Sequence, residues 1–191
     1  METTRPSLLL RLKSPSDQGA WYEFDHIYRP ILARFALARG LGAEQAEEVS
    51  QECITAISHY IKSFEYDPNK GKFKAWLRTM VNNRIKNLHR GRREIQAGTQ
   101  DFRDLQHNDD APDELFEKLW RQEHLKHCLR LIKSEVEKST FEAFVAYVLE
   151  EKPIEEVCKE HGMTSNQVHA IKSRMIKRLS LRMAELSGEQ E

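Results

Sequence analysis

Near the C-terminus, polar side chains recur at spacings that place them on the outer side of one helix. Val168, Ile171, Met175 and Leu179 share the inner face of that helix, and the outward residues are Ser165, Asn166, Gln167, His169, Lys172, Ser173 and Lys177. Asn and Gln can form two hydrogen bonds with the edge of adenine, Lys can reach the acceptors of guanine, and Ser, Lys and Arg can hold phosphates. This set of side chains is typical of a helix that enters the major groove of duplex DNA.

Two helix boundaries position these residues. Pro153 suits the first turn of a helix because its missing N–H is not needed there, and Gly162 supplies the left-handed conformation that ends the same helix. Thr164 followed by Gln167 forms the pattern of a capping box, which begins the last helix at about Ser165. Two short helices joined by a tight turn that contains Gly predict a helix-turn-helix. The alternative for this segment alone is a four-helix bundle that ends in a solvated Lys- and Arg-rich helix.

Charge is strongly segregated although the formal net charge is zero. Residues 62–93 hold ten Lys or Arg and two acids, and residues 165–182 hold five Lys or Arg and no acid. Residues 42–58 contain four Glu and no base, and residues 94–117 contain eight acids and one Arg. Two separate basic blocks can meet one polyanion at two places, which solvated faces of no particular function explain less well.

Apolar periodicity predicts an all-α protein. A stripe from Trp21 to Phe35 predicts one helix, a second helix follows Gly42 with strongly acidic first turns, and a third restarts at Phe73 after the turn residues 66–71. Phe73 and Trp76 lie in the apolar stripe of that third helix, so we expect them in the core. A second unit is expected to open with Leu115 and Leu119 and to end in two short helices. We expect two small helical domains, residues 1–92 and 113–186, joined by an acidic linker over residues 93–112.

Several classes of function lack their motifs in this sequence. It has no Gly-rich nucleotide loop, no nucleophile elbow and no converged catalytic set, so we do not expect an enzyme or a cofactor. His124, His127 and Cys128 share a helical face, but a single helix without a second cluster is weak support for a metal, and we predict none. Three widely spaced cysteines fit a reducing cytoplasm, and the apolar run Leu8–Leu10 is too short for a signal peptide or a membrane span.

Several stretches resemble one family, the extracytoplasmic-function (ECF) type of bacterial RNA polymerase sigma factors, of the sigma-70 family. Residues 45–52 (Gln-Ala-Glu-Glu-Val-Ser-Gln-Glu), residues 66–68 (Tyr-Asp-Pro), residues 71–77 (Gly-Lys-Phe-Lys-Ala-Trp-Leu) and Asn83 are similar to region 2 of these proteins in type, order and spacing. Residues 139–144 (Ser-Thr-Phe-Glu-Ala-Phe), the helix-turn-helix and residues 170–174 (Ala-Ile-Lys-Ser-Arg) resemble region 4. Together the two regions cover most of the chain.

The resemblance implies a role for each predicted domain of this chain. In region 2 the acidic helix docks on the β′ clamp helices of core RNA polymerase, which makes Glu47, Glu48, Gln51 and Glu52 the candidate polymerase-binding residues. The following turn and helix recognise the −10 promoter element as a single strand, which assigns to it Phe64, Tyr66, Lys70, Lys72, Lys74, Arg78, Asn82, Asn83 and Lys86. Aromatic rings beside Lys and Arg supply the stacking and phosphate neutralisation that single-strand binding requires.

Region 4 of the family reads the −35 element as duplex DNA. The corresponding residues here are Ser165, Asn166, Gln167, His169, Lys172, Ser173, Arg174 and Lys177. This chain departs from the commonest family pattern because Val168 is followed by His169-Ala170-Ile171, and Lys172-Ser173-Arg174 comes one turn later. The resemblance implies a cytoplasmic monomer that binds core RNA polymerase, through the β′ clamp helices and the β subunit, and promoter DNA; an anti-sigma factor or other regulator is a further candidate partner.

Two other functions share part of this pattern. A repressor or response-regulator output protein would also carry a helix-turn-helix, but its other half should contain a ligand pocket, a phosphoacceptor Asp after a strand, or a long dimerisation helix. An adaptor that binds only protein, such as an anti-sigma partner, could use the acidic helix but would leave the basic residues 62–93 without a purpose.

Overall fold

The computed structural model describes residues 6–63, 72–89 and 113–187, and every regular element in these ranges is helical, as predicted. The order of elements along the chain is α1 (Pro6–Leu12), α2 (Gln18–Ala38), α3 (Ala43–Tyr60), α4 (Lys72–His89), α5 (Glu114–Glu135), α6 (Lys138–Phe144), the π-helical turn η3 (Val145–Leu149), α7 (Ile154–His161) and α8 (Ser165–Ser187). They form two compact units that divide between Glu123 and His124, within α5. Each unit has its own hydrophobic core.

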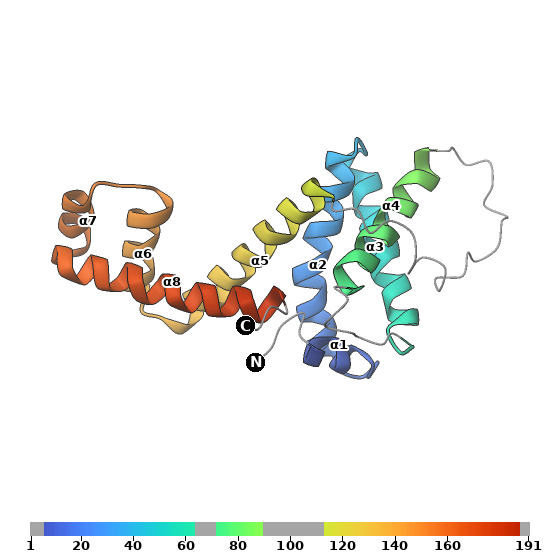
Figure 1. Cartoon of the computed structure of the whole chain (residues 1–191), viewed down its shortest axis with the longest axis horizontal. Helices are drawn as coiled ribbons and strands as arrows, with labels where there is room; N and C mark the ends of the chain where they lie inside the picture. Colours follow the sequence, from blue (N-terminus) through green and yellow to red (C-terminus); the bar gives the residue numbers. More distant parts are fainter. Residues whose placement is uncertain (1–5, 64–71, 90–112, 188–191) are drawn as a thin grey trace. The chain divides into compact units, whose positions relative to one another are not determined.

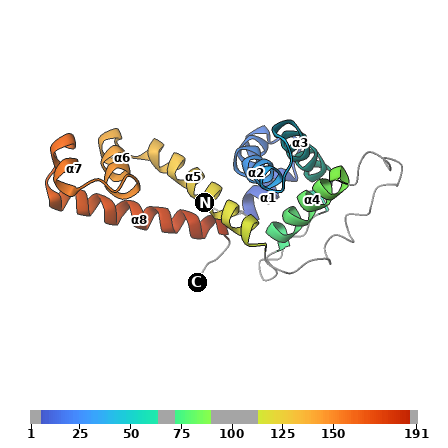
Figure 2. The same cartoon turned by 90° about the horizontal axis from the view of Figure 1, so that it is seen from above.

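The first unit is built around α2 and α3, which run side by side, with α4 beside them (Figure 1). Side-chain caps set where α2 and α5 begin: Asp17 Oδ1 accepts the Ala20 N–H at 2.9 Å, and Asp113 Oδ1 accepts the Phe116 N–H at 3.2 Å. Gly40, with φ of +92°, ends α2 in the conformation that glycine adopts at least cost. Seen from above, α1 to α4 gather round one core (Figure 2).

Aromatic side chains from α2, α4 and α5 fill the centre of the first unit. The rings of Tyr28 and Phe73 lie 5.4 Å apart, and Phe73 and Trp76 are both buried, which confirms the prediction that these two belong to the core. Phe116 of α5 packs edge-on against Phe35 at 5.1 Å. Burial of each such ring contributes about 1.5–3 kcal/mol, so α5 is an integral part of this core.

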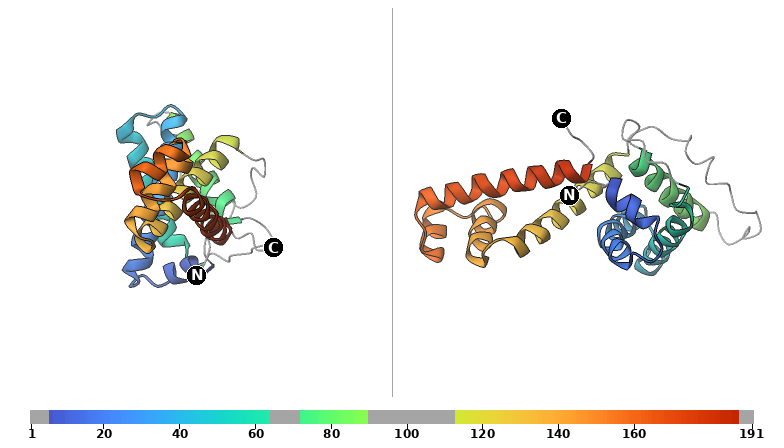
Figure 3. Two further views of the ribbon diagram at one scale, coloured as in Figure 1. Left: turned by 90° about the vertical axis from the view of Figure 1, so that its left-hand side faces the viewer. Right: turned by 90° about the horizontal axis from the view of Figure 1, so that it is seen from below.

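The second unit consists of the rest of α5 and of α6, η3, α7 and α8. Figure 3 shows α6 and α7 on the same side of the long α8. Its core joins one apolar face of α8 to the other helices through Ile132, Ala143, Phe144, Val157, Val168, Ile171 and Met175. Three of the four apolar positions predicted for the inner face of α8 are buried, and the fourth, Leu179, packs against the same core.

Three expectations about individual elements were wrong. Leu119 is buried in the core of the first unit and Leu115 packs against it, whereas both were expected to open the second. The last helix is 23 residues long rather than short. The first unit contains four α-helices and the start of a fifth rather than about three, and α1 was not predicted at all. The predicted linker, residues 93–112, lies outside the described residues, and the acidic residues Glu114 and Glu117 beyond it are helical.

Candidate binding surfaces

The four predicted polymerase-binding residues lie together on the outer side of α3. Glu47, Glu48, Gln51 and Glu52 are all exposed, and positions i, i+1, i+4 and i+5 share one side of a helix. The Glu47 side chain is 60% exposed and that of Glu52 is 47% exposed. The surface is therefore acidic and accessible, as docking on a basic partner requires.

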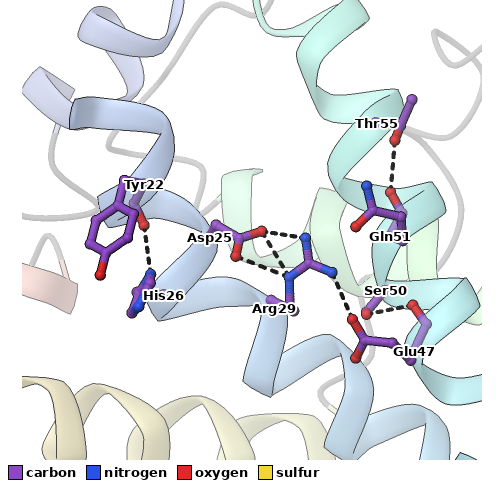
Figure 4. Close-up of polar contacts among 8 residues, drawn as sticks. All are labelled: Tyr22, Asp25, His26, Arg29, Glu47, Ser50, Gln51 and Thr55. Atoms are coloured by element: carbon purple, nitrogen blue, oxygen red, sulfur yellow. Dashed lines mark hydrogen bonds and ion pairs between the residues drawn. The ribbon is translucent and has the colours of Figure 1, made fainter. Parts of the chain in front are cut away.

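Arg29, on the neighbouring helix α2, braces this acidic surface (Figure 4). Its Nη1 donates to Glu47 Oε1 at 2.8 Å, and its Nε and Nη2 both donate to the Asp25 carboxylate. These hydrogen bonds, first that to Asp25 and then that to Glu47, raise the pKa of Arg29 against the effect of partial burial. Arg29 thus fixes one of the four predicted contacts in place. The sequence analysis missed it, although Asp25 and Arg29 stand at the i, i+4 spacing of a helical ion pair.

One turn earlier on α2, Tyr22 and His26 form a separate contact with each other (Figure 4). Their rings lie 4.0 Å apart, and His26 Nδ1 donates to the Tyr22 carbonyl oxygen at 3.1 Å. Tyr22 is 66% exposed, an unusual state for so large an aromatic side chain. The sequence analysis assigned no role to either residue.

A second ion pair links α3 to α4. Arg84 Nη1 lies 3.3 Å from Glu52 Oε2, so two of the four acidic-surface residues, Glu47 and Glu52, are engaged within the unit. Next to Glu52, Cys53 is fully buried. Burial raises the pKa of the Cys53 thiol to about 12, with Arg84 lowering it and Glu52 raising it by smaller amounts. This cysteine is a core residue, as its apolar position indicates.

The predicted −10 contacts on α4 are unequally accessible. Lys74, Arg78, Asn82 and Lys86 follow one another at four-residue intervals. Lys86 is exposed, Asn82 and its neighbour Asn83 are partly exposed, and Arg78 is only 6% exposed. Phe64, Tyr66 and Lys70 lie outside the described residues, as does the side chain of Lys72.

Lys74 is held by α5 of the same unit. Its Nζ donates to Glu117 Oε2 at 2.8 Å and lies 6.0 Å from the centre of the Trp120 ring. A cation over an aromatic face adds to the ion pair. The structure therefore places a predicted nucleic-acid contact in an internal salt bridge, which no local spacing in the sequence indicated.

In the second unit, α7 ends before Gly162 and α8 begins at Ser165, the two boundaries that the sequence predicted. Gly162 adopts φ of +64° and ψ of +33°, and the Met163 N–H donates to the Cys158 carbonyl at 3.0 Å across the end of α7. The capping box is present in both directions. The Thr164 N–H donates to Gln167 Oε1 at 2.8 Å, and the Gln167 N–H donates to Thr164 Oγ1 at 3.3 Å.

All eight residues predicted to contact the −35 element are exposed on α8. Some of their hydrogen-bonding atoms are already used within the chain, so these residues are not equally available to a DNA edge. Gln167 Oε1 is already an acceptor in the capping box, so bidentate bonding to adenine would require it to leave that position. Asn166, in the first turn of α8, has no such commitment to the cap.

Tyr147 supports two of the predicted contacts from behind. Its ring packs edge-on against His169 at 5.7 Å, and Lys172 Nζ lies 5.3 Å from the ring centre. Further along α8, Arg174 Nε donates to the Ala170 carbonyl at 3.4 Å. Tyr147 comes from the π-helical turn η3, a type of element often found at functional sites, and the sequence analysis did not single it out.

Lys152 ties the segment before α7 to α7 itself. Its Nζ donates to both carboxylate oxygens of Glu160, at 2.9 and 3.1 Å, and lies 3.9 Å from carboxylate oxygens of Glu150 and Glu156. The bond to Glu160 is the largest cause of the raised pKa of Lys152. These ion pairs hold α7 against the segment before it, and α7 in turn packs against α8.

Two predicted absences concern metals and membranes. The described residues bring no three His, Cys, Asp or Glu side chains together in a group that could hold a metal ion, and His124, His127 and Cys128 are buried in α5. Across residues 6–63, 72–89 and 113–187, no helix has both the length and the apolar character needed to span a bilayer.

Comparison with known proteins adds an independent observation about the first unit. Residues 26–95, which include α3, α4 and most of α2, match the family described as Sigma-70 region 2. No curated protein matches the chain. The matched segment contains both the acidic surface of α3 and the row of polar residues on α4. Residues 26–95 are therefore similar to Sigma-70 region 2, and this similarity supports placing the chain in the sigma-70 family of sigma factors, proteins of transcription initiation.

Proposed function

We propose that this chain is an RNA polymerase sigma factor of the ECF type. It binds core polymerase through the acidic surface of α3, meets the −10 element as a single strand through α4 and the turn before it, and reads the −35 element through α8. By holding the melted strand it promotes promoter opening in the cytoplasm, and it makes or breaks no covalent bond. An anti-sigma factor or another regulator would control its access to polymerase.

One observation carries the proposal furthest. A segment similar to Sigma-70 region 2 occurs in the same chain as a capped helix whose outward side chains are polar or cationic, with no acid between residues 165 and 182. The first implies polymerase and the −10 element, and the second has the chemistry of a major-groove helix. A repressor would need only the second feature.

Run-off transcription with purified core polymerase and a matched promoter tests the proposal. Transcription should require the protein, and the combined substitution Glu48→Ala, Gln51→Ala and Glu52→Ala should weaken its binding to core polymerase. Glu47 is left intact because Arg29 hydrogen-bonds to it at 2.8 Å and joins it to Asp25, whereas Arg84 lies 3.3 Å from Glu52 in a longer ion pair. The matched control is Glu114→Ala with Glu155→Ala, two exposed acids outside α3 whose removal changes the net charge equally.

Two results would overturn the proposal in different ways. Tight binding to duplex DNA by the protein alone, without any association with polymerase, would favour a repressor. Equal loss of polymerase binding in the control and the combined variant would show that net charge, rather than the α3 surface, determines the interaction. A melting profile like that of the unmodified protein confirms that the combined variant remains folded.

A further inference from the structure

The first three turns of α5 lie against α2 and α4 through alternating acids and aromatic rings. Each acid on this side of α5 faces a cation of the first unit: the pairs are Asp113 with Arg39, Glu117 with Lys74, and Glu123 with Arg34. From Asp113 to Glu123 the pairs extend over roughly 15 Å of helix. The α5 segment therefore neutralises three cations that come from two different helices.

The rings between these acids are part of the same contact. Phe116 packs against Phe35, and the Trp120 ring lies 5.4 Å from that of Tyr28. Trp120 also lies beneath the Lys74 ammonium. These rings are buried, so the first unit presents the cations at its surface, with carboxylates of its own chain bound to them.

Cations at a surface are one requirement of single-stranded nucleic acid binding, because Lys and Arg neutralise the phosphates of the strand. The exposure of the pairs is also informative. The side chains of Arg34, Arg39 and Lys74 are each about two-fifths exposed, whereas those of their acidic partners are more covered, at 8%, 15% and 27%. The exposed side of each cation is therefore accessible to solvent and to a phosphate, while its other side is bound to a carboxylate of residues 113–123.

We infer that residues 113–123 occupy part of a single-stranded DNA surface on the first unit, and that phosphates of a bound strand compete with their carboxylates for Arg34, Arg39 and Lys74. This inference rests on the proposed function, because Lys74 belongs to the predicted −10 contacts. It adds Arg34 and Arg39 of α2 to the strand-binding surface and makes α5 its internal competitor. Partly exposed ion pairs are individually weak and screened by salt, so a polyanion can displace them.

Removing the three carboxylates while preserving their shape tests the competition. The variant Asp113→Asn, Glu117→Gln and Glu123→Gln keeps the helix cap, because Asn caps as well as Asp. Its control is Glu114→Gln, Glu137→Gln and Glu155→Gln, which changes net charge equally at exposed acids for which the structure gives no ion pair. Fluorescence anisotropy with a labelled single-stranded oligonucleotide at low salt should show about tenfold tighter binding by the first variant than by the control. Equal affinity of the two variants would overturn the inference.

Hydrogen exchange gives a second measurement on the unmodified protein. Addition of the single-stranded oligonucleotide should accelerate amide exchange in residues 114–123, because loss of the three ion pairs loosens this part of α5 while its buried rings keep it in the core. Unchanged or slower exchange there would contradict the competition.

Run-off transcription separates failure of this inference from failure of the proposed function. If the carboxylate variant transcribes but binds the strand no tighter than its control, the competition is wrong and the sigma-factor role stands. If it binds the strand more tightly but no form of the protein supports transcription, the sigma-factor role is wrong and the surface beneath α5 remains a strand-binding site.

Discussion

The reciprocal capping box of α8 gives a prediction whose size follows from two hydrogen bonds. Thr164→Ala removes the Oγ1 that accepts the Gln167 N–H at 3.3 Å, and Gln167→Ala removes the Oε1 that accepts the Thr164 N–H at 2.8 Å. Both sites are exposed, so water replaces part of each bond, and loss of the Thr164 cap should cost about 1 kcal/mol. In a unit of this size that cost lowers Tm by about 4–8 °C. The double substitution should cost less than the sum of the two, because each residue acts through the other.

Melting of the second unit and NMR amide exchange at Gln167 measure these effects. Exchange is needed beside melting because two units need not unfold in one transition. Gln167→Glu is the informative control: it keeps an acceptor for the Thr164 N–H and adds a charge that the N-terminus of a helix favours, so stability should be retained. If Gln167→Glu destabilises the unit as much as Gln167→Ala, or if Thr164→Ala leaves exchange at Gln167 unchanged, the capping argument is refuted.

Three further predictions concern other sites. Gly162→Ala forces a side chain into a left-handed backbone with φ of +64° and should destabilise the second unit by about 1 kcal/mol in chemical denaturation. The first unit, in which Gly40 is unchanged, serves as the internal reference for this loss of stability. Phe116→Ala removes a fully buried ring that packs on Phe35 and should destabilise the first unit by about 3–5 kcal/mol; a loss below 1 kcal/mol would show that α5 is not part of that core. Native-state alkylation at pH 8 should modify the partly exposed Cys158 and spare Cys53, whose burial and pKa of about 12 keep it a protonated thiol, and peptide mass spectrometry would reveal a violation.

Local signals in the sequence predicted the elements that depend on neighbouring residues. Gly162 and the Thr164–Gln167 pair act within one turn of chain, so their types and spacing were sufficient to predict the end of α7 and the start of α8. The apolar stripes likewise predicted the inner faces of α2 and α8. Periodicity shows which face of a helix is apolar, but it does not show which core that face joins. For this reason Leu119 was expected in the second unit although it packs in the first.

For the candidate surfaces too, the sequence predicted the residues that share a helix face but not their partners on other helices. The acids of α3 could be recognised from type and spacing, whereas the partners of Lys74 and Glu47 lie 43 and 18 residues away along the chain and depend on the tertiary fold. The same holds for Arg78, which is buried although Lys74 and Asn82, one turn before and one turn after it on α4, are partly exposed. Its burial depends on tertiary packing, which the spacing does not give.

Helix α1 shows a different limit of local patterns. Leu8, Leu9 and Leu12 are all buried, but the run Leu8–Leu10 is too short for a membrane span or an export signal and does not by itself predict a helix. A helix of seven residues has little periodicity to detect, and its stability comes from packing rather than from propensity.

Helix α5 shows that the segment defined by sequence similarity and the segment that folds around one core have different limits in this protein. Sequence similarity marks residues 26–95, yet the core that contains this segment also uses Leu8 and Phe24 before it and Phe116 and Trp120 after it. A fragment cut at the limits of similarity would expose the faces of Phe35 and Phe73 that these side chains cover, and we expect it to be prone to aggregation. The stretch of chain that carries the family signature is therefore shorter than the stretch that folds as one cooperative body. Because the remaining turns of α5 belong to the second unit, a single helix contributes to the folding of both.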